Sequence, residues 1–409
     1  MKTKVHFREL VDVPARAYWL MLAVLAALIA VGGGAALYME HHGHWVTGMN
    51  NQVVWGTPHV FAVFLIVAAS GALNVASIGT VFGRTMYQPL ARLSALMAIA
   101  LLVGGLLVLV LDLGRPDRLI VAMTSYNFKS IFAWNIFLYT GFMAVTVLYL
   151  WTMFQKSLAR YYRPAGFLAF GWRLILTTGT GSIFGFLVAR QAYDAAIMAP
   201  LFILMSFSFG LAIFMLVTLV LYGAAGRPIG DALVARLKNL LGVFVAAVLF
   251  VVAIYHVTNL YATEHHGVEA FILRDGGIYT FVFWAGQVLL GSLVPLALLF
   301  HPTWSRSRAI VSLAAALVVI GGFAAIYVII IGGQAYPLVI FPNQEVIESG
   351  FVDGVVAQYA PSLPEVLLGL GGIGVALFLT LGASRILRFA PVSLADSIVD
   401  PHHAERAAS

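Results

Sequence analysis

Long uncharged segments of this sequence constrain its fold more than any short motif does. Residues 93–111, LSALMAIALLVGGLLVLVL, are nineteen consecutive residues without a charge. A helix of about 20 apolar residues crosses the hydrocarbon core of a bilayer, and only helices and closed barrels satisfy their backbone hydrogen bonds there. The whole chain is 61% hydrophobic and 10% charged, whereas soluble domains carry about 25% charged residues. The sequence therefore predicts an all-α integral membrane protein.

We predict ten membrane-spanning helices in one polytopic membrane domain, residues 1–409. Their expected ranges are 17–39, 57–82, 92–112, 131–154, 168–190, 196–222, 240–261, 278–300, 309–332 and 364–384. The fifth range contains Arg173, which we place near one end of its helix, where a long side chain extends to the interface. Residues 1–16 are polar and basic and precede an apolar run long enough to span, so we expect no cleavable signal peptide.

Lysine and arginine are divided unequally between the two sides of the predicted membrane domain. The side that includes both termini receives 18 of them, and the other side receives 5. Because cytoplasmic loops are enriched in these residues, we predict cytoplasmic termini and a location in the bacterial cytoplasmic (inner) membrane. The long loops 39–56, 262–277 and 333–363 then face outward and offer a surface to a partner. The basic residues lie in short loops beside the lipid bilayer, so the net charge of +6 does not indicate nucleic-acid binding.

Polar and ionisable residues gather near the outer ends of the predicted spans. They include His59, Asp112, Trp134, Tyr255, His256, Asn259 and Gln334. Such residues are costly in a membrane, and their presence there indicates a functional site. Because His256 and Asn259 are three residues apart, they share one helix face. Hydrogen bonding between helices is the simplest explanation for that pair.

The segment LDLGRPDR, residues 111–118, places four charged residues directly after the third span. Gly114 and Pro116 end the helix, because the residue before a proline is disfavoured in helical conformation. Two interpretations remain open. In the first, the segment is a helix stop with local ion pairs. In the second, Asp112 points inward, is held by Arg115, and acts as a buried acid that handles protons.

The chain has no cysteine, so it cannot ligate an iron–sulfur cluster through thiolates. The histidines of MEHHGHW, residues 39–45, lack the accompanying ligands of a defined metal site, and we expect no metal. A b-type cytochrome is one alternative, because His59 and His256 are the intramembrane candidates for two axial haem ligands. A secondary transporter is another, although transporters place their sites near the midplane and the polar groups here lie at one interface.

Two apolar segments resemble each other in outline, VFLIVAASG at residues 63–71 and LFILMSFSFG at residues 201–210. At an offset of 138, Phe64 aligns with Phe202, whereas Gly71 and Gly210 fall out of register by one residue. The pattern is compatible with a parallel internal repeat. Chance similarity between apolar helices is the favoured explanation.

Several longer motifs give the sequence a family resemblance. They are WGTPHVFAVFLIVAASGALNVAS (55–77), LVLDLGRPDR (109–118), SYNFKSIFAWNIFLY (125–139), TTGTGSIFGFLVARQAYDAAIMAPLFILMSFSFGLAIF (177–214) and YVIIIGGQAYPL (327–338). In their order and spacing the chain resembles the polysulfide reductase NrfD family. The last two are most similar to the ten-span DsrP type of the sulfite-reductase-associated DsrMKJOP complexes.

The resemblance implies two four-helix bundles, residues 57–190 and 196–332, with the first span and the terminal span 364–384 added. It implies a quinone, menaquinone or ubiquinone, as bound substrate near the outer face, with no haem or iron–sulfur cluster in this chain. It also implies a periplasmic ferredoxin-like iron–sulfur subunit and other subunits of a membrane redox complex. His59 matches the family's quinone-contacting histidine, whereas Trp55 replaces an asparagine one turn earlier. The family's D-x-G-R-P motif corresponds to residues 112–116.

The expected function is that of a quinone-interacting membrane anchor in a respiratory or sulfur-metabolism oxidoreductase, inactive alone. We expect electrons to pass between the quinone pool and the outer partner, with proton movement left open. His59 is expected to hydrogen-bond a quinone oxygen, and Asp112 to relay protons under the influence of Arg115. The remaining expected contacts of the quinone are Trp55, Trp134, Tyr255 and His256.

Overall fold

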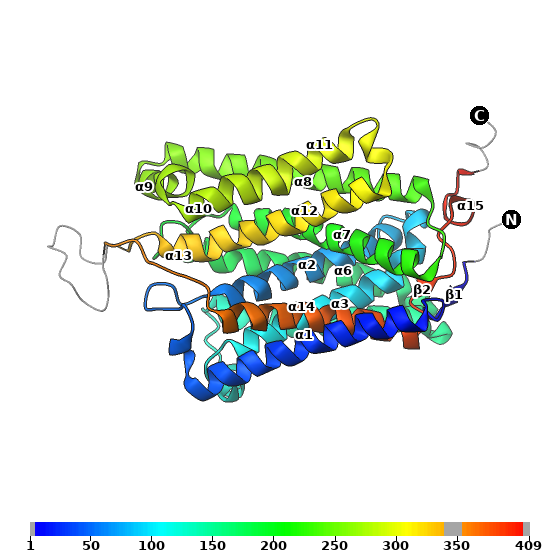
Figure 1. The fold of residues 1–409 in the computed structure, drawn as a ribbon, viewed down its shortest axis with the longest axis horizontal. Coiled ribbons are helices and arrows are strands. Elements are labelled where there is room, and N and C mark those ends of the chain that lie inside the picture. Colours follow the sequence, from blue (N-terminus) through cyan, green and yellow to red (C-terminus); the bar gives the residue numbers. More distant parts are fainter. Residues whose placement is uncertain (1–4, 339–353, 404–409) are drawn as a thin grey trace.

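A computed structural model describes residues 5–338 and 354–403, and it is almost entirely helical. Its long helices run side by side along one axis (Figure 1). They are α1 (Ala15–His42), α2 (Thr57–Thr80), α3 (Ala91–Leu111), α5 (Ile131–Phe154), α6 (Tyr162–Gly185), α7 (Met198–Ala225), α8 (Asp231–Tyr261), α12 (Arg308–Tyr327) and α14 (Leu363–Ile386). Between α8 and α12 one further continuous helix is formed by α10 (Ile278–Phe281), the π-helical η7 (Val282–Leu293) and α11 (Val294–Phe300).

Short elements connect the long helices. They are β1 (Phe7–Arg8), η1 (His44–Val46), η2 (Thr85–Leu90), η3 (Pro116–Arg118), α4 (Leu119–Thr124), η4 (Lys156–Tyr161), η5 (Thr263–His265), α9 (His266–Ala270), η6 (Phe271–Asp275), η8 (Trp304–Arg306), η9 (Val328–Gly332), α13 (Gly333–Ala335), β2 (Ala390–Pro391) and α15 (Asp396–Val399). The strands β1 and β2 pair antiparallel, so both ends of the described chain lie at one end of the molecule (Figure 1). The opposite end, which we call the loop end, is formed by residues 43–56, 112–130, 186–197, 262–277, 333–338 and 354–362. The remainder of the predicted outer loop 333–363, residues 339–353, lies outside the described residues.

Nine helices in the described part of the chain are long and apolar enough to cross a membrane. They coincide with nine of the ten predicted spans, which agrees with the predicted class of all-α membrane protein. The tenth predicted span corresponds to α6, a helix of 24 residues that carries Arg173.

The position of Arg173 differs from the prediction. Because α6 begins at Tyr162, Arg173 lies in the middle of the helix, where its side chain is fully buried. Its Nη2 donates a hydrogen bond to Asn74 Oδ1 at 2.8 Å, and its Nη1 donates one to the Ser70 carbonyl at 3.4 Å. The prediction that this side chain extends to the interface is wrong. The neighbouring helix α2 supplies polar acceptors at the same depth, so the guanidinium group is hydrogen-bonded inside the protein.

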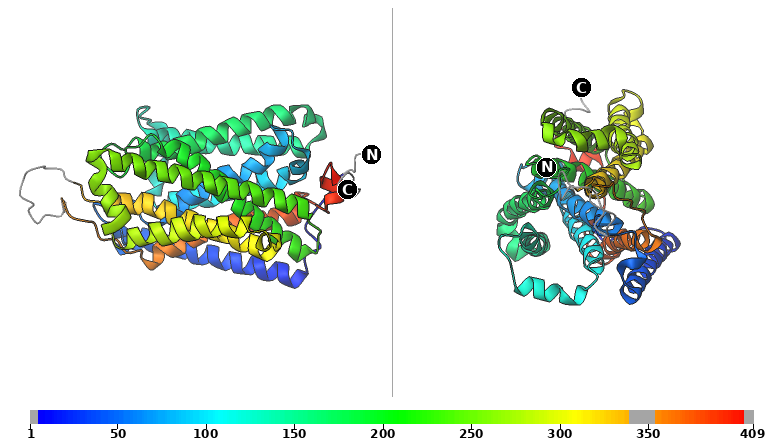
Figure 2. Two further views of the ribbon diagram at one scale, coloured as in Figure 1. Left: turned by 90° about the horizontal axis from the view of Figure 1, so that it is seen from above. Right: turned by 90° about the vertical axis from the view of Figure 1, so that its left-hand side faces the viewer.

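Helix α2 is almost completely buried and packs against α3, α6, α7 and α14. Helix α5 packs against α3 and α6, while α7 also packs against α6, α8 and α12. The continuous helix 278–300 packs against α12 and α8. Helices α1 and α14 lie together at the side of the molecule (Figure 2). The loop end of α2 therefore lies close to several other helix ends.

Two glycines let α2 and α7 approach backbone to backbone. A Cβ atom on Gly71 would collide with the Ser206 carbonyl group of α7, and a Cβ atom on Gly210 would collide with the backbone at Gly71 and Ala72. Small residues of this kind allow close packing of membrane helices. The two segments that resemble each other in sequence are thus in direct contact.

Candidate functional site

An aromatic group surrounds His59 at the loop end. His59 is the third residue of α2 and follows Pro58, a residue suited to the first helical turn. Its ring stacks on Trp55, with centroids 5.3 Å apart and planes inclined by 10°. The indole of Trp55 also contacts Phe132 of α5, Phe184 of α6 and Tyr193, at centroid distances of 5.7, 6.0 and 6.4 Å. Helices α2, α5 and α6 and the segment 186–197 therefore meet at the predicted quinone residue.

The backbone beside this group is held by Gln334 of α13, whose side chain is buried. Its Oε1 accepts hydrogen bonds from the N–H groups of Val54 and Trp55, both at 3.0 Å. Its Nε2 donates to the carbonyl groups of Trp55 and Ile330, at 3.0 and 2.9 Å. Gln334 belongs to the last of the five family motifs, residues 327–338, and it fixes the backbone of Trp55 in the first, residues 55–77. The sequence marked Gln334 as a polar residue at the outer interface but did not assign it this role.

Arg190 reinforces the same contact. Its Nη1 donates to the carbonyl group of Gln334 and its Nη2 to the carbonyl group of Gln52, both at 2.7 Å. Burial lowers the pKa of Arg190, with the nearby Tyr193 opposing that shift. An arginine keeps its charge in such a setting, so it can bind two carbonyl groups from different loops.

The structure does not support the expected pairing of Arg115 with Asp112. Arg115 instead forms two hydrogen bonds to Asp117, from Nε to Oδ1 at 3.0 Å and from Nη2 to Oδ2 at 2.9 Å. Both of these side chains are more than half exposed. Gly114 has a φ of +66°, a left-handed conformation that ends the helix and turns the chain away from it. Arg115 therefore meets its near neighbour rather than the carboxyl group at the helix end.

Asp112 is the first residue after α3, and its Oδ1 atom is buried without a hydrogen-bond partner among the described residues. Burial, with a smaller contribution from the negative charge of Glu365, raises the pKa of Asp112 to about 8. A carboxyl group with such a pKa can both give and accept a proton near neutral pH. This property fits the predicted relay role, although Arg115 is not the residue that tunes it.

His44 is a further residue at the same place that the sequence did not single out. A Cβ atom on Gly114 would lie 3.5 Å from His44 Nδ1, so the imidazole ring covers the turn after α3. The Nε2 atom of His44 is also buried without a partner in the described part of the chain. In the sequence, His44 stands out only as part of the histidine-rich segment MEHHGHW, and nothing there indicates its contact with Gly114. No group of three or more metal-binding side chains occurs within the described residues.

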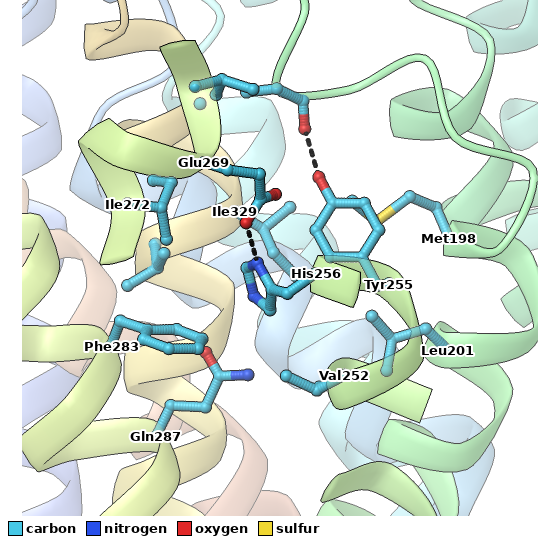
Figure 3. Close-up of a pocket in the computed structure, with 14 residues that line it drawn as sticks. Met198, Leu201, Val252, Tyr255, His256, Glu269, Ile272, Phe283, Gln287 and Ile329 are labelled. Atoms are coloured by element: carbon cyan, nitrogen blue, oxygen red, sulfur yellow. Dashed lines mark hydrogen bonds and ion pairs between the residues drawn. The ribbon is translucent and has the colours of Figure 1, made fainter. Parts of the chain in front are cut away.

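Tyr255 and His256 lie in a different place, beside a small cavity between helices α7, α8 and the continuous helix 278–300 (Figure 3). His256 Nδ1 lies 2.7 Å from Glu269 Oε2, and Asn259 Nδ2 donates to Glu269 Oε1 at 2.9 Å. The prediction that His256 and Asn259 share a helix face is confirmed. The cavity volume is about 40 Å³, enough for water but far too small for a quinone or a haem.

The seven predicted site residues are therefore not one cluster. His59 and Trp55 form the aromatic group. Trp134 is more than half exposed, and its indole N–H donates to the Phe128 carbonyl group. Tyr255 is linked to the aromatic group indirectly, because its hydroxyl donates to the Ala192 carbonyl group at 3.0 Å and the next residue is Tyr193.

The family of this chain is shown by its similarity to known protein families. Residues 45–337 match the family described as polysulphide reductase, NrfD. The chain belongs to this family. The matched residues run from η1 to the start of the last outer loop, so the NrfD portion contains α2 to α13 and both clusters described above. Helices α1 and α14 lie outside it, and the family resemblance seen in the sequence is confirmed.

Three relatives extend the comparison of this NrfD-family chain. The Hdr-like menaquinol oxidoreductase integral membrane subunit of Archaeoglobus fulgidus is 25% identical over 385 residues, covering 94% of this chain and 96% of the relative. A putative dimethyl sulfoxide reductase membrane subunit of Halobacterium salinarum is 28% identical over 407 residues, with 90% coverage of each protein. A polysulfide reductase polypeptide of Wolinella succinogenes is 27% identical over 311 residues, covering 70% of this chain and 96% of the relative.

Proposed function

We propose that this chain is the quinone-interacting membrane subunit of a multi-subunit oxidoreductase. The observation that carries the proposal is the similarity, over 94% of the chain, to an integral membrane subunit named for menaquinol oxidoreduction. The aromatic group around His59 supports it, because ligand sites are typically lined by aromatic side chains with a few polar groups. The substrate is menaquinone or ubiquinone.

The proposed arrangement in the membrane has ten spans, with α6 as the tenth. A buried arginine is compatible with a span when its charge is enclosed by protein rather than lipid, and Arg173 is fully buried. Helices α2, α3, α5 and α6 form the first proposed bundle, and α7, α8, the helix 278–300 and α12 form the second. We assign the loop end to the outer face, because most of the basic residues other than the buried Arg173 belong to the other side.

In the proposed mechanism His59 donates or accepts a hydrogen bond at one quinone oxygen, and Trp55 holds the imidazole in place by stacking. Quinone reduction takes up two electrons and two protons. Asp112, with its raised pKa, is the proposed proton donor and acceptor of this site. The electrons pass to or from a partner, because a chain without cysteine ligates no iron–sulfur cluster through thiolates. A ferredoxin-like subunit on the loop end is the partner we propose.

The proposal is tested with the complex purified in mild detergent through a tag on this chain. We expect an iron–sulfur protein to co-purify, and the complex to oxidise or reduce a quinone analogue. His59→Ala removes one hydrogen bond, worth about 0.5–1.5 kcal/mol, and should raise the KM for the quinone roughly two- to tenfold. His41→Ala, at an exposed histidine of the same end, is the matched control. A complex that contains the chain but reacts with no quinone would refute the proposal.

A further inference from the structure

The cavity beside His256 and Glu269 is too small for the proposed substrate, yet it is lined by unusual residues for a membrane helix bundle. Its polar lining is Tyr255, His256, Glu269 and Gln287 (Figure 3). Polar groups at such a site are costly unless they bind a partner. Each of these polar groups therefore needs a hydrogen-bond partner.

Neither a lysine nor an arginine pairs with the carboxyl group of Glu269 among the described residues. Its side chain is 1% exposed, and its two oxygens are occupied by His256 and Asn259. His256 is its only ion-pair partner among the described residues. A charged carboxylate is stable in a buried place only when a positive charge or strong hydrogen bonds accompany it. The carboxyl group of Glu269 therefore depends on the hydrogen bonds that it shares with His256 and Asn259.

Few other ionisable groups bear on the pair. Of the elements packed around it, α8 adds Tyr255, whose hydroxyl donates to the Ala192 carbonyl group. The lining residues from α7, η7, η9 and the segment 186–197 are not ionisable. Tyr336 lies against Gly267 of α9, outside the cavity lining. His256 and Glu269 are therefore the ionisable pair that lines this cavity.

An independent observation indicates water in the cavity. Gln287 is 8% exposed, and its side-chain amide has no hydrogen-bond partner in the described part of the chain, although it lines the cavity. The segment that carries it, η7, is π-helical, and Ser292 Oγ bonds back to the Gln287 carbonyl group five residues earlier. Such distortions frequently mark functional positions in helices. A buried primary amide without a protein partner requires water.

The volume agrees with this interpretation. A cavity of about 40 Å³ has room for about three water molecules, since each needs roughly 10–15 Å³ by this measure. Gln287 also lines a second cavity of about 20 Å³, which contains Ser208 and Ser292. Gln287 therefore lies between two small cavities, one lined by Glu269 and the other by Ser208 and Ser292.

We propose that His256, Glu269 and the water beside Gln287 form a proton-binding site that exchanges with the loop end, separate from the His59 aromatic group. The pair binds one proton, and the water molecules carry it to and from the solvent. This inference concerns proton binding at rest and does not depend on the proposed quinone function.

The test measures proton uptake by the purified complex without turnover. Wild-type and variant complexes are acidified from about pH 9 to about pH 6, a range in which exposed carboxylates stay ionised, and an indicator dye counts the protons bound. Glu269→Gln should bind about one proton fewer per chain, because the variant lacks the carboxyl group of the proposed site. Glu264→Gln is the matched control, since Glu264 is exposed and should leave the count unchanged.

A second variant keeps the test decisive if Glu269→Gln does not assemble. Asn259→Ala retains both ionisable groups but removes a donor to the carboxylate, so the proton count should stay the same while the midpoint of uptake moves to higher pH. Equal proton counts in wild type and Glu269→Gln would overturn the proposal. So would an unchanged midpoint in Asn259→Ala, or an equal loss of protons in Glu264→Gln. Quinone-linked activity is not measured, so failure here is distinct from failure of the proposed function.

Discussion

Replacement of Gln334 by leucine tests whether the site depends on a side chain that touches no substrate. The variant keeps an apolar volume in α13 but leaves the N–H groups of Val54 and Trp55 and the carbonyl group of Trp55 without their partner. Each hydrogen bond contributes about 0.5–1.5 kcal/mol net, which gives roughly 1.5–4.5 kcal/mol for three. Val54 is 53% exposed, so water replaces part of the loss and the lower half of that range applies.

A loss of about 1.5–3 kcal/mol corresponds to a change of roughly 10- to 150-fold in the equilibrium between docked and released Trp55. Because a released Trp55 no longer stacks on His59, we expect the KM for the quinone to rise by up to this factor. The kcat at saturating quinone should change little, since the proton-handling residues are untouched. The assay is steady-state turnover of the purified complex over a range of quinone concentrations.

The control for this prediction is Gln358→Leu, the same substitution at an exposed position of the loop end. It should leave both KM and kcat as in the wild type. An assembled Gln334→Leu complex with an unchanged KM would show that Trp55 is held by other contacts, and the positioning role of Gln334 would be wrong. A fall in kcat with unchanged KM would contradict it equally.

Three further predictions concern Asp112, the contact between α2 and α7, and the topology of the chain in the membrane. The pKa of Asp112 is raised to about 8 in the folded protein, so the folded protein keeps a proton that the unfolded chain releases near pH 4. The free energy of unfolding should therefore fall as pH rises from about 4 to 8. Asp112→Asn should flatten this pH dependence, measured by chemical denaturation. Gly210→Ala should reduce the yield of folded complex on size-exclusion chromatography because its Cβ collides with α2, whereas Gly223→Ala in the same helix meets nothing within 4 Å and should not. The chain has no cysteine, so a membrane-impermeant thiol reagent should label Glu264→Cys in intact cells and Ser157→Cys only after the membrane is opened; the reverse pattern would invert the proposed topology.

The sequence alone determined the class of the protein and the place of its spans. Each apolar run is a local property of about 20 residues, and the bilayer requires every such run to satisfy its own backbone hydrogen bonds as a helix. For this reason the nine apolar helices coincide with predicted ranges. The shared face of His256 and Asn259 was equally predictable, because helical spacing fixes it.

The tertiary structure alone decided which polar side chains meet. The partners of Gln334 lie 279 and 280 residues away in the chain, and no local pattern reports such a contact. Arg115 turned away from Asp112 because one left-handed glycine redirected the chain, and Arg173 stayed buried because α2 offered it acceptors in mid-helix. Apolar periodicity specifies how a helix faces lipid or protein, whereas a hydrogen bond depends on atomic positions within a few tenths of an ångström. Those positions are set only when the helices pack.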